Sequence, residues 1–187
     1  MAYSCVEDPA PGRGHRFSAG FLGRDVLEVA PELIGAWLCR RWPDGRVQRR
    51  RITEVEAYRG EEDSACHARA GRTKRTAVMY GPGGRAYVYL CYGIHNLLNV
   101  VTGSTDQPQA ALIRGIEGHP GPGRLTKALA IDRSLNGVVL EPASGLWLEA
   151  GPTPADIESG PRIGIGYAST EDQARLWRWS LCPASPS

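Results

Sequence analysis

The feature that most constrains the fold of this 187-residue chain is a series of strand-like segments separated by short turn signals. Pro43-Asp44-Gly45 is such a signal, because proline presets φ and glycine accepts a positive φ. Tyr92 to Asn96 similarly predicts a turn between two strands. Hairpin-linked strands with few helices are typical of an α+β fold with an antiparallel sheet. The segments with strand character are residues 35–41, 47–58, 85–91, 97–102, 109–117, 146–148 and 162–167.

Few helices are expected. Asp25 can cap a short helix that begins at Val26, with Pro31 opening a second turn. Another helix should follow Gly121-Pro122-Gly123, where Leu125, Ala128 and Leu129 share a face. We expect one domain over residues 17–182, with flexible tails at residues 1–16 and 183–187.

Composition narrows the function classes. Apolar residues make up 42% of the chain, which is enough for a sizeable core. The longest apolar runs are far shorter than the roughly 20 residues that span a bilayer, and residues 1–16 do not resemble a secretory signal. Five scattered cysteines fit free thiols in a reducing compartment. We therefore expect a cytoplasmic protein with no membrane association.

Charge is distributed unevenly along the chain, although the net charge is only +2. Residues 64–105 contain no Asp or Glu and include five basic side chains. Residues 138–161 contain only acidic charges. This asymmetry predicts one face that attracts polyanions, although an unevenly charged solvated surface is an equally good interpretation.

The most unusual strand is the segment from Ile52 to Tyr58. Alternation sends Ile52, Glu54, Glu56 and Tyr58 to one face of this strand. A partly desolvated carboxylate there would be a stronger base. Alternatively, both glutamates pair with arginines at positions 49–51 or with Arg114. Taken alone, the segment favours these ion pairs.

Tyrosines and glycines elsewhere suggest contacts with nucleic acid. Tyr87 and Tyr89 should share a strand face, and Tyr92 should lie near the turn, where it could stack on bases or insert into a duplex. Cross-strand packing is the alternative, and it suits Tyr87 best. His67 either contacts a base or satisfies a turn. The glycines before Arg124 either bind phosphate at a helix N-terminus or cap the helix.

Five ordered segments together resemble the alkyladenine (3-methyladenine) DNA glycosylase family in its bacterial form. The resemblance extends over roughly Phe17 to Cys182 and includes differences at Thr76, where relatives often have Asn, and at His95, where animal members have Tyr. The segments are Ile52–Tyr58, Cys66–Arg69, Ala86–Val100, Ala111–Arg114 and Gly121–Ala130.

This resemblance implies a compact domain around a curved antiparallel sheet with a protruding β-hairpin, without a metal or an organic cofactor. It implies that Glu56 is the general base and that Arg114 lies near the attacking water. Tyr58 and Tyr89 would sandwich a flipped purine, His67 would hydrogen-bond to it, and Asn99 would disfavour guanine. At the DNA, Tyr92 would fill the vacated space and Arg124 would contact a phosphate.

The resemblance also implies a monomer that acts on double-stranded DNA with damaged purines at the bacterial nucleoid. Its reaction would be direct hydrolysis of the N-glycosidic bond of 3-methyladenine and other alkylpurines, and of hypoxanthine or ethenoadenine. Two alternatives stay open. One is a non-enzymatic nucleic-acid-binding module of related fold, which would not need Glu56. The other is a nucleoside hydrolase, which would not need Tyr92.

Overall fold

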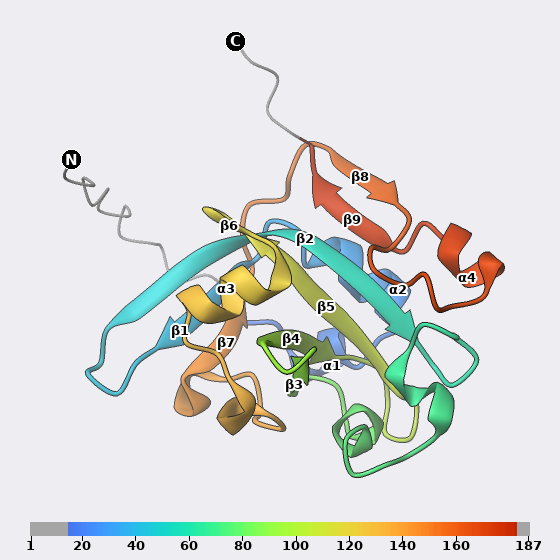
Figure 1. The fold of residues 1–187 in the computed structure, drawn as a ribbon. Helices are drawn as coiled ribbons and strands as arrows, with labels where there is room; N and C mark the ends of the chain where they lie inside the picture. The colour runs from blue at the N-terminus through green and yellow to red at the C-terminus, as the bar shows by residue number, and fades with distance from the viewer. Residues whose placement is uncertain (1–14, 183–187) are drawn as a thin grey trace.

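The sheet is organised around one long strand, β2 (Val47–Arg59), in the computed structural model, which describes residues 15–182 (Figure 1). The first half of β2 pairs with β1 (Trp37–Arg41), and its second half pairs with β5 (Gln109–Ile116). The path through the sheet is β3-β4-β5-β2-β1-β7, and every pairing is antiparallel. The predicted α+β class with an antiparallel sheet is confirmed.

The other strands extend this path. They are β3 (Ala86–Cys91), β4 (His95–Val101), β6 (His119–Pro120), β7 (Leu146–Glu149), β8 (Ile157–Gly160) and β9 (Arg178–Leu181). Strand β6 pairs with β5, whereas β9 pairs with both β2 and β8. The C-terminal segment therefore packs back on the sheet beside the second half of β2.

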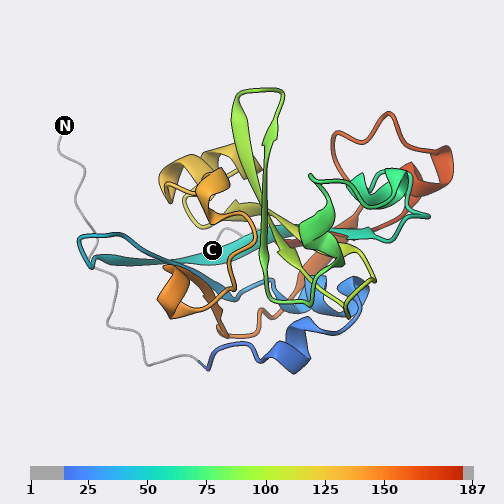
Figure 2. The ribbon, with the colours of Figure 1, turned by 90° about the horizontal axis from the view of Figure 1, so that it is seen from below.

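Short helices cover the two sides of the sheet. The α-helices are α1 (Ala19–Leu22), α2 (Val26–Glu32), α3 (Pro122–Ala128) and α4 (Thr170–Ala174), and the 3-10 turns are η1 (His67–Ala70), η2 (Ala77–Tyr80), η3 (Arg133–Leu135) and η4 (Pro142–Ser144). Figures 1 and 2 show α2 and α3 on opposite sides of the β2–β5 pair. The Asp25 side chain accepts a hydrogen bond from the Leu27 N–H, so the predicted cap of α2 is confirmed.

A bulge in β2 corrects one predicted strand face. The register between β2 and β5 shifts between Ile52 and Val55. Because an extra residue reverses which side the following side chains face, Ile52 packs in the same buried cluster as Val55 and Ala57. The prediction that Ile52 shares a face with Glu54 and Glu56 was therefore wrong.

Strands β3 and β4 form a hairpin that projects beyond the rest of the domain (Figure 2). Its turn consists of Tyr92, Gly93 and Ile94, with positive φ at Tyr92 (49°) and Gly93 (72°). Strand β4 begins at His95, two residues before the predicted start, because Cys91 pairs with His95 across the hairpin. The hairpin tip is consequently tight, and its side chains point into solvent.

Residues 162–167 contain no strand; they form an irregular loop between β8, which was not predicted, and α4. Residues 1–14 and 183–187, predicted as tails, lie outside the described residues. His15 and Arg16 were also assigned to the tail, but the His15 backbone carbonyl accepts a hydrogen bond from the Ala150 N–H, and the backbone of Arg16 forms an isolated antiparallel β-bridge with that of Glu149.

Candidate active site

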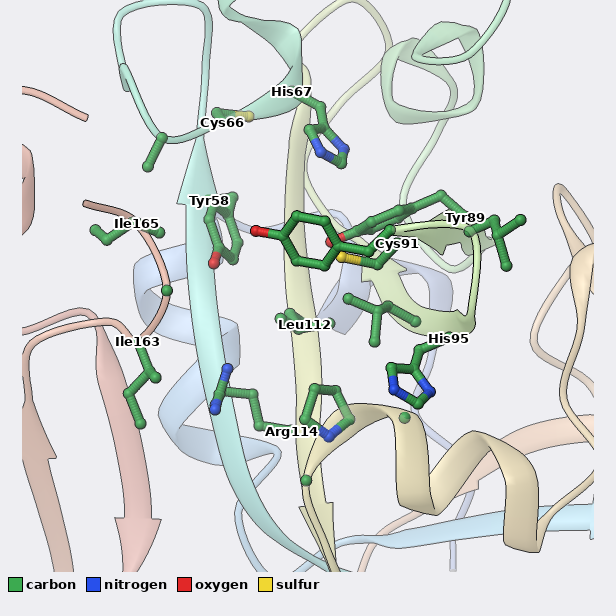
Figure 3. Close-up of a pocket in the computed structure, with 18 of the residues that line it drawn as sticks. Tyr58, Cys66, His67, Tyr89, Cys91, His95, Leu112, Arg114, Ile163 and Ile165 are labelled. Carbon is green, nitrogen blue, oxygen red and sulfur yellow. The ribbon is translucent and has the colours of Figure 1, made fainter. Parts of the chain in front are cut away.

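A cavity of about 960 Å³ opens between the hairpin, the N-terminus of α3 and the loop of residues 162–167 (Figure 3). Tyr58 and Arg114, from neighbouring strands β2 and β5, lie along its floor. His67 and Tyr89 lie at the end of the cavity opposite Arg114. The exposed basic side chains Arg69 and Arg75 are at its edge, so part of the acid-free segment does face this cavity.

Glu56 lies directly behind this floor and is fully buried. Its Oε1 accepts a hydrogen bond from the Ile163 N–H at 2.7 Å and lies 3.4 Å from Arg114 Nε. Its Oε2 accepts a hydrogen bond from the Tyr58 hydroxyl at 2.9 Å. Because Tyr58, Arg114 and Ile163 all line the cavity, the carboxylate is one side chain away from anything that binds there.

Burial raises the pKa of Glu56, whereas the charge of Arg114 and the hydrogen bonds from Ile163 and Tyr58 lower it and so limit the rise. Burial and the neighbouring carboxylate also raise the pKa of Tyr58, so its hydroxyl stays a donor. The site therefore holds a desolvated carboxylate with partners for its charged form. Such a group can accept a proton near neutral pH.

The predicted ion pairs of the two glutamates are present as well. Arg114 Nε lies 3.2 Å from Glu54 Oε1, which also receives Arg178 Nη1 at 3.2 Å. Arg114 is thus shared by two carboxylates of β2. The salt-bridge interpretation and the general-base interpretation of Glu56 are compatible, because Glu54 takes most of the pairing with arginine and leaves Glu56 the more weakly compensated group.

Two aromatic rings, Tyr89 and His67, line the other end of the cavity, and a third, Tyr87, packs against both. The rings of Tyr89 and Tyr87 are tilted with centroids 5.4 Å apart, and the His67 ring meets Tyr89 edge-on at 4.5 Å. Tyr87 is almost fully buried, as the packing interpretation expected. Tyr58 and Tyr89 both line the cavity, so the structure brings together the two tyrosines of the predicted sandwich with His67 beside them.

Both ring nitrogens of His67 have partners. Nε2 lies 3.1 Å from Arg75 Nη2, and Nδ1 lies 3.0 Å from the Tyr87 hydroxyl. Because arginine can only donate, Nε2 accepts and the proton of the neutral ring is on Nδ1. Burial, Arg75 and Arg69 lower the pKa of His67 to about 4. His67 is therefore a neutral ring at working pH, held in one tautomer.

The other predicted site residues differ in how deeply they are buried and in whether they line the cavity. Asn99 is buried in β4, where its Nδ2 donates to the Tyr87 carbonyl at 3.1 Å, and it does not line the cavity. Arg124, at the start of α3, is exposed on the rim. Tyr92 is 89% exposed at the hairpin tip, where Ile94 is also exposed. Both tip residues are free to contact a partner that covers the cavity.

The two differences from relatives have separate consequences. Thr76 is buried, and its hydroxyl accepts from the Thr73 N–H at 2.8 Å and bonds the Gly71 carbonyl, so it closes a turn. His95 lines the cavity next to Gly123, where an added Cβ would approach the histidine ring to 2.9 Å. Thr76 therefore acts in local structure, and His95 shapes the cavity rim against α3.

Sequence reasoning missed the loop that closes the site. Ile163 supplies the N–H that binds Glu56, and Arg162 forms a fully buried ion pair with Asp63. Both residues fall in the segment that was predicted to be a strand. The one local signal was an arginine beside an apolar residue, which does not distinguish a buried ion pair from an exposed charge.

An antiparallel α+β domain with a buried carboxylate behind a cavity lined in part by aromatic rings has the features of an enzyme active site. The family model for methylpurine-DNA glycosylase matches residues 20–120 and 118–183. The chain belongs to this family and is a DNA glycosylase, an enzyme that hydrolyses N-glycosyl bonds.

Individual relatives agree with this assignment. A protein of Methanocella arvoryzae is 45% identical over 85% of this chain and 88% of its own length. A protein of Nitrosococcus oceani is 43% identical over 89% of each chain. One from Anaeromyxobacter dehalogenans strain 2CP-C is 48% identical over 86% of this chain and 81% of its own. All three are provisionally named as 3-methyladenine DNA glycosylases. Within residues 15–182, the helices are too short or too polar to span a membrane.

Proposed function

We propose that this enzyme extracts an alkylated purine, such as 3-methyladenine, from duplex DNA and cleaves its N-glycosidic bond with a water activated by Glu56. The observation that carries the proposal is the fully buried Glu56 carboxylate behind Tyr58 and Arg114, with its pKa raised by burial. We include hypoxanthine and ethenoadenine among the proposed substrates, because both are flat purine lesions. We expect a monomer that works at the bacterial nucleoid.

Recognition follows from the aromatic walls. A base inside a duplex must leave the stack to be cut, which costs a few kcal/mol. Stacking between Tyr58 and Tyr89 recovers part of this energy, and a cationic alkylpurine gains further attraction from the ring faces. The exposed Tyr92 inserts into the space that the base leaves and stacks on its former neighbours. Arg124 on the rim contacts a phosphate.

Cleavage follows from the carboxylate. The water oxygen attacks the anomeric carbon, the C–N bond breaks, and its electron pair leaves with the base. Glu56 takes the proton from water and its negative charge stabilises the positive charge that develops on the sugar. Arg114 and Ile163 both contact Glu56 Oε1 and line the cavity, so only these two residues separate this oxygen from the cavity, and a shift of the Arg114 side chain on lesion binding would admit the attacking water to it. The base that leaves a cationic lesion is neutral and needs no acid.

Direct hydrolysis is favoured over a lyase reaction through an imine. The chain has two lysines, Lys74 and Lys127. Both are exposed, and neither lines the cavity. An amine nucleophile would need to lie beside the anomeric carbon and have a lowered pKa. The buried carboxylate meets the requirement of a hydrolase instead.

The test compares wild type with Glu56→Gln on duplexes that carry one 3-methyladenine or hypoxanthine, followed by alkaline cleavage of abasic sites. The glutamine keeps Oε1 for Ile163 and Arg114, while its amide faces Tyr58, so the pocket stays intact. Loss of a general base lowers the rate by about 100- to 10,000-fold. Undiminished base release by Glu56→Gln would contradict the role of Glu56.

The same assay separates the alternatives. A nucleic-acid-binding module would bind both duplexes and release no base. A nucleoside hydrolase would cleave free nucleosides at least as well as duplex lesions. Borohydride treatment during the reaction should trap no covalent complex, whereas an imine-forming lyase would be trapped.

A further inference from the structure

We propose that the buried ion pair between Arg162 and Asp63 positions the general base, by holding the Ile163 N–H and the Tyr58 side chain against the Glu56 carboxylate. This inference rests on the proposed role of Glu56 and adds two positioning residues to it. Neither side chain lines the cavity, so both act through the residues that do.

The pair is closely matched in geometry and completely desolvated. Arg162 Nη1 lies 2.6 Å from Asp63 Oδ2, and Nη2 lies 2.9 Å from Oδ1, with both side chains at 0% exposure. A buried ion pair is often no more stabilising than apolar residues of the same volume, because both charges lose their hydration. Its presence here fits a need to fix geometry, which a planar bidentate pair does well.

Asp63 connects β2 to the segment that carries His67. Its Oδ2 also accepts from the Arg59 N–H at the end of β2, and its Oδ1 accepts from the Ala65 N–H. All four contacts of the carboxylate are thus charge-assisted bonds to neighbouring parts of the site. The aspartate fixes how the chain leaves Tyr58 and how it approaches His67.

Arg162 connects the same region to the loop of residues 162–167. Its Nη1 donates to the Ala57 carbonyl at 2.9 Å, between Glu56 and Tyr58 on β2. Its guanidinium carbon lies 4.9 Å from the centre of the Tyr58 ring and 5.0 Å from that of Trp177. Because Arg162 is buried and Tyr58 lines the cavity, the arginine supports the tyrosine ring from the side away from the ligand.

The next residue along the chain is Ile163, whose N–H donates to Glu56 Oε1 at 2.7 Å. Its loop forms no strand, so no ladder of hydrogen bonds fixes this N–H; the adjacent Arg162 does. The N–H stabilises the charged carboxylate and lowers the pKa of Glu56. If the anchor loosens, the N–H withdraws, the pKa of Glu56 rises further, and the Tyr58 hydroxyl loses its alignment.

The other groups that face Glu56 come from three elements. Arg114 of β5 approaches its Oε1, while Glu54 and Tyr58 belong to β2. Arg178 of β9 pairs with Glu54. Arg162 also carries a charge that acts on Glu56, and Arg162→Lys keeps this charge. A change in the titration of Glu56 in this variant therefore reports on the loop anchor, through the Ile163 N–H and the Tyr58 side chain that it holds.

The experiment uses the full chain with Arg162→Lys and Asp63→Asn. Lysine keeps the positive charge but cannot form the bidentate pair or reach Ala57 at the same time. The control is Arg49→Lys, because Arg49 forms a similar pair with the buried Glu149 on β7, away from the cavity. Three quantities are measured: the single-turnover rate against pH, the pKa of Glu56 by carbon-13 NMR, and thermal unfolding.

For both site variants we expect a rate about 10- to 100-fold lower at neutral pH, as a small misplacement in an active site can cause. In Arg162→Lys, which keeps the positive charge near Glu56, the acid limb of the rate and the NMR titration of Glu56 should both move to higher pH. Affinity for a duplex containing an abasic site should change little. Arg49→Lys should lower the unfolding temperature and leave rate and titration as in wild type.

Other outcomes overturn the proposal. Wild-type rates and titration in folded Arg162→Lys and Asp63→Asn would show that the pair does not act on Glu56. Failure of both variants to fold at 10 °C, with Arg49→Lys folding normally, would assign the pair to stability alone. Failure of the proposed function would give different results: the wild-type enzyme would release no base, or Glu56→Gln would be fully active. The NMR titration does not depend on activity.

Discussion

Replacing Tyr92 with alanine tests how the hairpin engages duplex DNA. Tyr92 is 89% exposed at the tip of the β3–β4 turn, and the structure shows no hydrogen bond or ring contact for it among the described residues. Its removal therefore costs the free protein little packing, and a surface change of this kind alters the free energy of unfolding by less than about 0.5 kcal/mol. Alanine also keeps the Cβ, so the positive φ of 49° is equally strained in both. The effect should thus arise almost entirely in the DNA complex.

The magnitude follows from stacking. One aromatic side chain stacked on bases contributes about 1–3 kcal/mol, which corresponds to about a 5- to 150-fold weaker complex. This loss should appear with a lesion paired in a duplex, where the tyrosine replaces the extruded base. With the same lesion in a single strand or a bulge, little pairing or stacking must be broken, and we expect a clearly smaller loss.

The assay measures single-turnover excision and binding for both substrates with wild type, Tyr92→Ala and Tyr92→Phe. Phenylalanine keeps the ring and should retain most activity. Leu176→Ala is the control, because Leu176 is 53% exposed between α4 and β9 and does not line the cavity. Equal losses on paired and unpaired lesions would refute the reasoning, as would a phenylalanine variant as defective as alanine.

Two further predictions concern the ionisable groups of the site. Tyr58→Phe removes the hydroxyl whose hydrogen bond lowers the pKa of Glu56. The acid limb of the rate should therefore move to higher pH, while the affinity for the lesion, which depends on the ring, changes little. An unmoved acid limb would argue against this hydrogen bond. The pKa of His67 is about 4 in the folded protein, against 6.5 for the free side chain. Between these two values the unfolded state binds a proton that the folded state does not. His67 therefore contributes stability that is present above pH 6.5 and is lost as the pH falls towards 4. His67→Gln should flatten the fall in unfolding free energy over this range, measured by urea denaturation at several pH values, and an unchanged slope would contradict the depressed pKa.

Much of the sheet could be predicted from the sequence because its signals are local. The turn at Pro43-Asp44-Gly45 and the alternation within β2 depend on φ preferences and on the two-residue period of a strand. These signals correctly placed β1, β2, β3, β5 and β7, within one or two residues, and the cap of α2. The same alternation placed Glu54, Glu56 and Tyr58 on one face, but taken alone it favoured ion pairs, and only the resemblance singled out Glu56.

Features that depend on a partner strand or on burial were decided only by the tertiary structure. The bulge after Ile52 reflects pairing with β5, where Gly115 lies opposite Glu54, and no residue in β2 announces it. The sequence offered ion pairing or base chemistry for Glu56. The structure contains the ion pair with Arg114 and also the desolvation that raises the pKa of Glu56, and this desolvation exists only once Tyr58, Arg114 and Ile163 cover the carboxylate.

The loop that closes the site shows the same limit most clearly. Arg162 and Asp63 are 99 positions apart in the sequence, so no local pattern connects them. Residues 162–167 were predicted to form a strand because isoleucine and tyrosine alternate with glycine there. The sequence by itself determined which strands form and which face carries the carboxylates, since both follow from local backbone preferences. The tertiary structure determined that one buried ion pair ties three distant segments around Glu56, because only folding removes water from the two charges and makes their pairing obligatory.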